Sequence, residues 1–85
     1  MYYVYAIASL DRNYIYVGLT NNVERRLMEH DKGKEKTTAP YKPFILIFTE
    51  ECTDRLNARI REKYWKSGTG KRQLRNIRDE ILSKK

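Results

Sequence analysis

The stretches YYVYAIA (residues 2–8) and YIYVGL (residues 14–19) decide the fold. Both are rich in aromatic and β-branched residues and lack helical spacing, so each is predicted to be a β-strand. The turn-forming run DRN (residues 11–13) separates them. A short connection with these residues favours an antiparallel hairpin.

The length of the hairpin loop decides whether Tyr5 and Tyr16 lie on the same face of the sheet, because side chains alternate between the two faces of a strand. A three-residue loop separates them, whereas an even loop such as residues 11–14 brings them together. We expect the even loop, because two hydroxyls that act on one site must converge. Gly18 shares the face of Tyr16, and it marks a strand end or lets the backbone approach a phosphate.

The next segment is predicted to be a helix over residues 22–32. Asn21 is the expected N-cap, with Glu24 three residues on as a variant of the capping box, and Gly33 is expected to end the helix. At about 100° per residue, one face of this helix carries Val23, Arg26, Leu27 and His30. Polar groups on a core-facing stripe need partners, so Arg26 and the only histidine become candidate site residues.

The stretch of residues 33–43 is polar and contains two prolines, which predicts an exposed loop. The run FILIF (residues 44–48) is continuously apolar. Such a run is typical of a strand that is buried on both faces.

Two further helices are predicted in the C-terminal part. Thr53 or Asp54 is expected to cap the first, which runs to about Ser67. Its core-facing stripe is expected to be Leu56, Ile60 and Tyr64. The run GTG (residues 68–70) should break it before a last helix over residues 71–82. That last helix is expected to bury Leu74, Ile77 and Ile81 and to present Lys71, Arg75 and Arg78 on another face.

The order ββαβαα predicts a single α+β domain over residues 1–85, with a small three-stranded, mostly antiparallel sheet and flanking helices. A hydrophobic content of 40% argues against disorder. No apolar run approaches the roughly 18 residues that span a bilayer, and the N-terminus lacks the positive charge of a signal peptide. One cysteine supports neither an internal disulfide nor a Cys-rich zinc site. We therefore expect no membrane association and a cytoplasmic location.

The net charge of +7 is concentrated in residues 55–85, which carry eleven cations and three anions. A basic cluster of this kind favours a polyanion such as nucleic acid as partner. A solvated, solubilising surface explains the charge equally well.

The tripeptides YVY (residues 3–5) and YVG (residues 16–18) resemble the two halves of the motif that names the GIY-YIG endonuclease superfamily, with Tyr3 where the name has glycine. Arg26 and His30 stand at the spacing of the family's helix. Residues 61–63 (REK) resemble the segment with the family's metal-binding glutamate.

The resemblance extends over nearly the whole chain. Asn76 falls roughly where larger family members keep an asparagine. The chain most resembles short, stand-alone members related to the N-terminal nuclease domain of the bacterial excision-repair incision subunit. That subunit has a lysine directly after its second motif, where this chain has Leu19.

The resemblance implies a Mg²⁺- or Mn²⁺-dependent endonuclease that hydrolyses DNA phosphodiester bonds by a one-metal mechanism, with DNA repair as its setting. The catalytic residues would be Tyr5, Tyr16, Arg26, His30 and Glu62, with Glu62 as the metal ligand. A single carboxylate suits Mg²⁺, which keeps several waters and completes its shell with substrate phosphate. Contacts to nucleic acid would come from Gly18, Lys34, Lys36, Lys71 and Arg75.

Each of these roles has a plainer alternative. Glu62 could be a solvated partner of Lys66 one turn later. A tyrosine that acts as a base at neutral pH needs its pKa lowered by about 3 units. Neighbouring positive charges would have to stabilise the ionised form by roughly 4 kcal/mol. The sequence does not indicate whether Tyr5 or Tyr16 would be that base.

Two other functions also fit the residues. The chain could be a nucleic-acid-binding module with little or no catalysis, or an interaction domain whose basic helices bind an acidic protein. A partner protein that supplies specificity is compatible with either nucleic-acid function. The steep salt dependence of DNA binding separates the nucleic-acid functions from the protein-binding one. The sequence indicates neither the oligomeric state nor the preferred nucleic-acid substrate.

Overall fold

The computed structural model of the protein describes residues 1–84. Its elements are β1 (Tyr2–Ser9), β2 (Ile15–Thr20), α1 (Val23–Asp31), a 3₁₀ turn (Ala39–Tyr41), β3 (Phe44–Cys52), α2 (Arg55–Lys66) and α3 (Gly68–Ser83). The three strands form one sheet in the order β2-β1-β3, and both strand pairs are antiparallel. The predicted α+β class and the order ββαβαα are confirmed.

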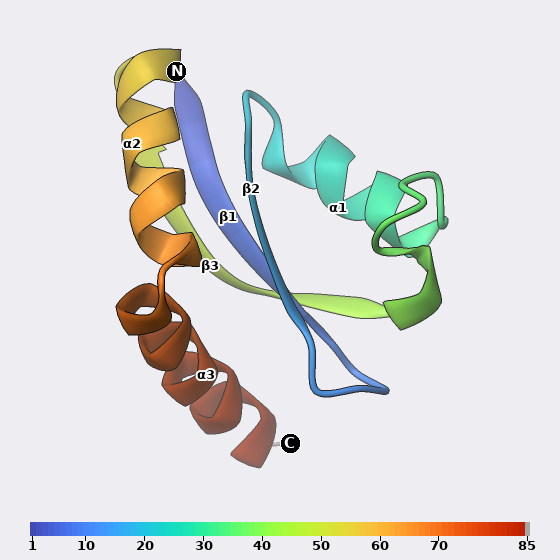
Figure 1. The fold of residues 1–85 in the computed structure, drawn as a ribbon. Helices are drawn as coiled ribbons and strands as arrows, with labels where there is room; N and C mark the ends of the chain where they lie inside the picture. Colours follow the sequence, from blue (N-terminus) through green and yellow to red (C-terminus); the bar gives the residue numbers. More distant parts are fainter. Residues whose placement is uncertain (85) are drawn as a thin grey trace.

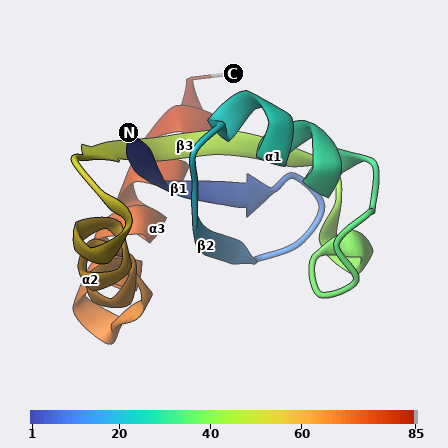
Figure 2. The same cartoon turned by 90° about the horizontal axis from the view of Figure 1, so that it is seen from above.

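The helices cover both faces of the sheet. Helix α1 and the loop that follows it lie on one face, and α2 and α3 lie on the other (Figures 1 and 2). This arrangement buries the central strand β1 almost completely, from Val4 to Ser9. The most deeply buried strand is therefore the N-terminal one, and not the apolar run of residues 44–48.

Each face of the sheet has its own apolar core. The core under α2 and α3 includes Val4, Ala6, Val17, Ile47, Ala58, Trp65 and Leu74. The core under α1 is smaller and more aromatic, with Tyr5, Ile7 and Phe44 at its centre and Tyr14, Tyr16, Leu27 and Tyr41 packed against them. The two predicted site tyrosines thus belong to the core under α1.

Strand β3 reaches both cores, as the apolar run of residues 44–48 predicts, but it lies at the edge of the sheet. The register of β1 against β3 shifts between Ala6 and Ile7, where Ile47 is an extra residue on β3, and Ile47 and Phe48 belong to the same core. Because β3 is an edge strand, Phe48 stays partly exposed while Ile47 is buried.

The N-cap of α1 is Asn22, one residue later than predicted. The Asn22 side chain accepts a hydrogen bond from the backbone N–H of Arg25 at 3.0 Å. Asn21 instead accepts a hydrogen bond from the Arg25 guanidinium at 3.1 Å. The predicted stop near Gly33 is correct, because Gly33 has a φ of +75°, which favours glycine.

The predicted core stripe of α2 is wrong. Leu56, Ile60 and Tyr64 are 72%, 58% and 36% exposed. The buried face instead carries Ala58 and Trp65.

The carboxylate of Glu50 on β3 explains this orientation of α2. It receives two hydrogen bonds from the Arg61 guanidinium, at 2.8 and 3.1 Å, and one from the Trp65 indole at 3.1 Å. These contacts hold the Arg61 and Trp65 side of the helix against the sheet.

Helix α3 begins earlier than predicted, because the run of residues 68–70 forms its first turn instead of a break. Ser67 caps it and accepts a hydrogen bond from the Gly70 backbone N–H at 3.3 Å. Gly70 is required there, since a Cβ would collide with the backbone of Tyr64 and Trp65. Its predicted inner face is confirmed, with Leu74 fully buried. None of the helices in residues 1–84 is long and apolar enough to cross a membrane.

Truncation of Leu74 and of Leu56 should have very different effects on stability, because only Leu74 is buried. Leu74→Ala removes a fully buried side chain and should lower the free energy of unfolding by about 2–5 kcal/mol. Leu56→Ala removes an exposed one and should change it by no more than about 0.5 kcal/mol. Urea titration followed by Trp65 fluorescence measures both. Equal losses in the two variants would contradict the orientation of α2.

Candidate functional site

Tyr5 and Tyr16 lie on the same face of the sheet, under α1. Tyr5 is opposite Gly18 and Tyr16 is opposite Ile7 in the β1–β2 ladder. The backbone N–H of Ser9 donates to the Tyr14 carbonyl, which closes an even loop of residues 10–13. The predicted even number of loop residues is confirmed, but the loop begins at residue 10 instead of residue 11. The two rings have centroids 6.2 Å apart.

His30 completes a hydrogen-bonded chain with Tyr5. Its Nε2 lies 2.8 Å from the Tyr5 hydroxyl, and its Nδ1 lies 2.7 Å from Oγ1 of Thr38. Thr38 in turn donates to the backbone carbonyl of Glu35 at 3.4 Å. Because the Thr38 hydroxyl gives its proton to Glu35, it accepts from Nδ1–H of His30. Nε2 then accepts from the Tyr5 hydroxyl, so all three hydrogen bonds run in one direction.

Thr38 was not predicted as a site residue, because residues 33–43 were predicted to form an exposed loop. His30 and Thr38 are both fully shielded from solvent. A buried imidazole with an unpaired ring nitrogen is unfavourable, and Thr38 supplies the missing partner. The only signal in the sequence was indirect. A polar residue on the core-facing side of a helix needs a partner, but the pattern does not say which loop residue provides it.

Burial raises the pKa of Tyr5 to about 12, even though the neighbouring Arg26 works in the opposite direction. Burial and the charge of Arg26 also lower the pKa of His30 below its ordinary value. Tyr5 is therefore protonated and His30 is neutral at pH 7. Lowering the pKa of Tyr5 to about 7 would require a shift of about 5 units, which corresponds to roughly 7 kcal/mol. Tyr5 acts as a hydrogen-bond donor in the free protein.

Arg26 lies beside the tyrosines on the inner side of α1. Its guanidinium contacts Glu29 at 2.8 Å and Glu35 at 3.7 Å, and its side chain is 24% exposed. It also interacts with the Tyr5 hydroxyl. A guanidinium has five N–H donors in a planar fork, so these contacts leave donors for a phosphate.

Glu62 belongs to α2, which lies on the face of the sheet opposite α1 and packs against β1 and β2 (Figure 1). Its side chain is only 14% exposed, and it forms an ion pair with Lys66 at 3.4 Å. The charge of Glu62 is one of the influences that raise the pKa of Tyr5. Glu62 therefore has both its plain role as a partner of Lys66 and an electrostatic link to the tyrosine site.

The residues fit a divalent cation that is held by a single carboxylate. Within residues 1–84, no three His, Cys, Asp or Glu side chains lie together as a protein-only metal centre. Glu62 offers one carboxylate, and Mg²⁺ typically takes one or two protein carboxylates with water and substrate oxygens. Arg26, Tyr5 and Tyr16 are not ligands of choice for such an ion.

Gly18 leaves room for the Tyr5 hydroxyl. A Cβ at Gly18 would lie 2.7 Å from the Tyr5 hydroxyl oxygen and 3.0 Å from the Tyr16 ring. Gly18 is itself buried. The structure thus gives this glycine a packing role beneath the two tyrosines.

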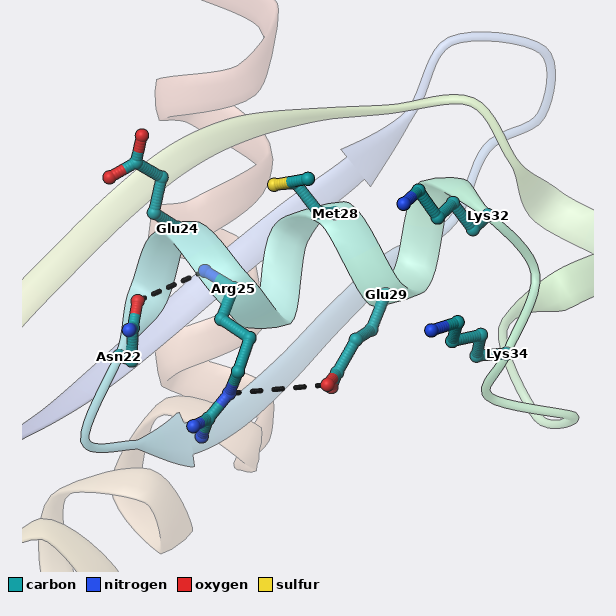
Figure 3. Close-up of a pocket in the computed structure, with 7 residues that line it drawn as sticks. All are labelled: Asn22, Glu24, Arg25, Met28, Glu29, Lys32 and Lys34. Atoms are coloured by element: carbon teal, nitrogen blue, oxygen red, sulfur yellow. Dashed lines mark hydrogen bonds and ion pairs between the residues drawn. The ribbon is translucent and has the colours of Figure 1, made fainter.

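The four predicted basic contacts lie on opposite faces of the sheet. Lys34 lines a hollow on the outer side of α1, together with Asn22, Glu24, Arg25, Met28, Glu29 and Lys32 (Figure 3). Lys36 is exposed in the following loop. Lys71 and Arg75 lie on α3, where the Lys71 ammonium donates to the Ile15 carbonyl at 2.6 Å. The two groups do not form one continuous basic patch.

The chain matches a family of nuclease-type domains. The model of the GIY-YIG catalytic domain matches residues 1–76, so the chain belongs to the GIY-YIG family. Among its relatives are small UPF0213 proteins. One from Natronomonas pharaonis is 38% identical over 80 residues, covering 93% of each chain. UPF0213 protein YazA of Bacillus subtilis is 31% identical over 84 residues, covering 98% of this chain and 84% of its own.

A solved structure supports the same assignment. The solution NMR structure of a UPF0213 protein from Bacillus halodurans has a TM-score of 0.52 and 33% identity. The match covers 91% of this chain and 85% of that one. The family resemblance and the fold predicted from the sequence are therefore confirmed, and the chain is similar to small stand-alone members of the family.

Gly18→Ala should disturb the site more than the fold. The new methyl group must push away the Tyr5 hydroxyl, which stretches its hydrogen bond to His30. We expect the His30 side-chain NMR signals to shift, with a loss of stability of about 1–3 kcal/mol from overpacking. Gly68→Ala is the matched control, since a Cβ there meets nothing within 4 Å. Unchanged His30 signals in Gly18→Ala would contradict this packing.

Acidification should weaken the fold through His30. Its folded-state pKa lies below the unfolded value of 6.5, so the unfolded chain takes up the proton first. The free energy of unfolding should therefore fall as the pH drops below about 6.5. Glu29 and Glu50 have lowered pKa values, so their stabilising effect is lost only below the ordinary value of 4.5.

Urea titrations between pH 7.5 and pH 5 test this dependence. His30 is the only histidine, so His30→Gln should flatten the change between pH 6.5 and 5. A slope that persists in His30→Gln would contradict the assignment.

Proposed function

We propose that the protein is a divalent-metal-dependent endonuclease that hydrolyses phosphodiester bonds in DNA, with activity centred on Tyr16, Arg26 and Glu62. The observation that carries the proposal is the convergence of Tyr5, Tyr16, Arg26 and His30 on one face of the sheet. Membership of the GIY-YIG catalytic domain family supports it. The position of Glu62, mostly buried on α2 and electrostatically linked to Tyr5, is compatible with it.

Arg26 is the proposed phosphate-binding group. Its remaining N–H donors can hold two phosphoryl oxygens and stabilise the charge that develops on them during hydrolysis. Its contacts with Glu29 and Glu35 fix the guanidinium at the end of a long, flexible side chain. Positioning of this kind reduces the entropy that is lost when the substrate binds.

The two tyrosines have different proposed roles. Tyr5 is 1% exposed and is held as a donor to His30, so it supports the site. Tyr16 is partly exposed on the same face and is the tyrosine that substrate can reach. We assign Tyr16 to positioning the attacking water through its hydroxyl group.

Glu62 is the proposed ligand for the metal ion. A divalent cation there would supply positive charge next to the phosphoryl and leaving oxygens. To bind it, Glu62 must exchange its ion pair with Lys66 for the cation. Lys66 is then free to face the nucleic-acid backbone.

A nucleic-acid-binding module with little catalysis is the second candidate function. Two observations favour it: Glu62 already has a cationic partner, and the pKa of Tyr5 is about 12. Both are expected of a site that binds phosphate through Arg26 without activating water. An interaction with a protein that supplies specificity is compatible with either candidate.

Cleavage of labelled duplex, nicked, branched and single-stranded substrates, with Mg²⁺ or Mn²⁺ against EDTA, tests the proposal. Arg26→Ala and Glu62→Gln should each lower the rate by about 100- to 1,000-fold. Tyr16→Phe should lose more activity than Tyr5→Phe. Arg59→Ala, an exposed α2 variant with the same charge change as Arg26→Ala, should keep full activity.

Cleavage that survives in both Arg26→Ala and Glu62→Gln would contradict the proposed site. Salt-sensitive binding without any cleavage would favour the binding module instead.

A further inference from the structure

A second hollow lies where the beginning of β2 meets α3. It has a volume of about 280 Å³ and is lined by Asn13, Tyr14, Ile15, Lys71, Arg75 and Arg78. We call it the α3 basic pocket. Three of its six lining side chains are cations, and they come from one face of one helix, at positions three and four residues apart.

Contacts within the protein hold several of the side chains that line the pocket. Arg78 donates to the Asn13 side chain at 2.7 Å, and Lys71 donates to the Ile15 carbonyl at 2.6 Å. Tyr14 is fixed by stacking on Tyr41, with ring centroids 3.9 Å apart. The wall and two of the cations are thus held in place before any ligand arrives.

Its positive charge is poorly compensated. Within residues 1–84, the only carboxylate that pairs with the three cations is Asp79, which contacts Arg78 at 3.0 Å and is 66% exposed. Lys71 is partly buried, and burial together with the charges of Lys66 and Arg75 lowers its pKa. Cations that repel one another around a hollow are stabilised by an anion placed between them.

The pocket reaches β2 within two residues of Tyr16. Tyr14 lines the pocket, and Tyr16 lies two residues further along β2, about 7 Å away at the usual rise of a strand. On α2, Lys66 forms an ion pair with Glu62. The positive charge of Lys66 also contributes to lowering the pKa of Lys71.

We infer that the α3 basic pocket binds a backbone phosphate of the nucleic acid, close along the strand to the phosphate that Arg26 would hold. The inference rests on the proposed function, because it places a second phosphate on the same substrate. An Arg fork and a lysine ammonium on one face are the groups that bind phosphate oxygens in nucleic-acid complexes. The pocket sets the position of the strand and carries no information on base sequence.

Fluorescence anisotropy of a labelled oligonucleotide in EDTA tests this inference, because binding is then measured without cleavage. Both single-stranded and duplex probes are titrated over a range of NaCl concentrations. Arg75→Gln is the informative variant, since Arg75 is exposed and its loss should not unfold the chain. Arg59→Gln makes the same charge change on the exposed side of α2, far along the chain from the pocket-lining residues.

Arg75→Gln should weaken binding by about tenfold at low salt. It should also reduce the slope of log K against log[NaCl] by about 0.7–0.9, the value for one phosphate contact. Arg59→Gln should change neither quantity measurably. Equal effects in the two variants, or an unchanged slope in Arg75→Gln, would overturn the inference.

Failure of this inference is distinguishable from failure of the proposed function. If Arg75→Gln reduces the salt slope but the wild-type chain cuts no substrate with Mg²⁺ or Mn²⁺, phosphate binding in the pocket is supported and the proposed endonuclease activity is contradicted. If the wild-type chain cuts substrate and Arg75→Gln binds like Arg59→Gln, phosphate binding in the pocket is contradicted and the proposed endonuclease activity is supported. If neither probe binds, the inference is overturned.

Discussion

The buried chain of hydrogen bonds from Tyr5 through His30 to Thr38 is the constraint on which the rest of the site depends. It ties together the central strand β1, the last turn of α1 and the loop that follows. Each polar group in it has a partner, so none of the three is left unsatisfied in the apolar core under α1. Removing one member would leave the others buried without partners, which is usually more costly than the bond itself.

This constraint gives the two tyrosines of the hairpin different properties. Tyr5 packs closely against Gly18 with its hydroxyl proton directed at His30, and burial raises the pKa of that hydroxyl. Tyr16 is on the same face but reaches solvent. The site therefore has a rigid inner part and an accessible outer part. Arg26 joins the two, since it contacts Tyr5 on one side and the partly exposed carboxylates Glu29 and Glu35 on the other.

Much of this arrangement could be predicted because it follows from simple periodicities. The two-residue repeat of the strands, with an even loop, places Tyr5 and Tyr16 together. The helical repeat places Arg26 and His30 on one face of α1. The family resemblance added Glu62, which residue patterns alone do not distinguish from a solvated partner of Lys66.

The errors arose where a tertiary contact outweighed a local pattern. The apolar spacing of Leu56 and Ile60 suggested the wrong face of α2, because the Glu50 carboxylate holds Arg61 and Trp65 against β3 instead. The cap of α1 was misplaced by one residue, since two adjacent asparagines are equally good caps in sequence terms. Thr38 was missed because its partner, His30, meets it only after the polar loop has folded back.

The most direct test of the account is the protonation state of His30 in solution. Ring ¹⁵N chemical shifts should show a neutral imidazole at pH 7, with the proton on Nδ1 and Nε2 accepting from Tyr5. Tyr5→Phe should change the Nε2 shift and leave Nδ1 nearly unaffected, whereas Thr38→Val should act mainly on Nδ1. A charged imidazole at pH 7, or a neutral one with its proton on Nε2, would contradict the hydrogen-bond chain at the centre of the site.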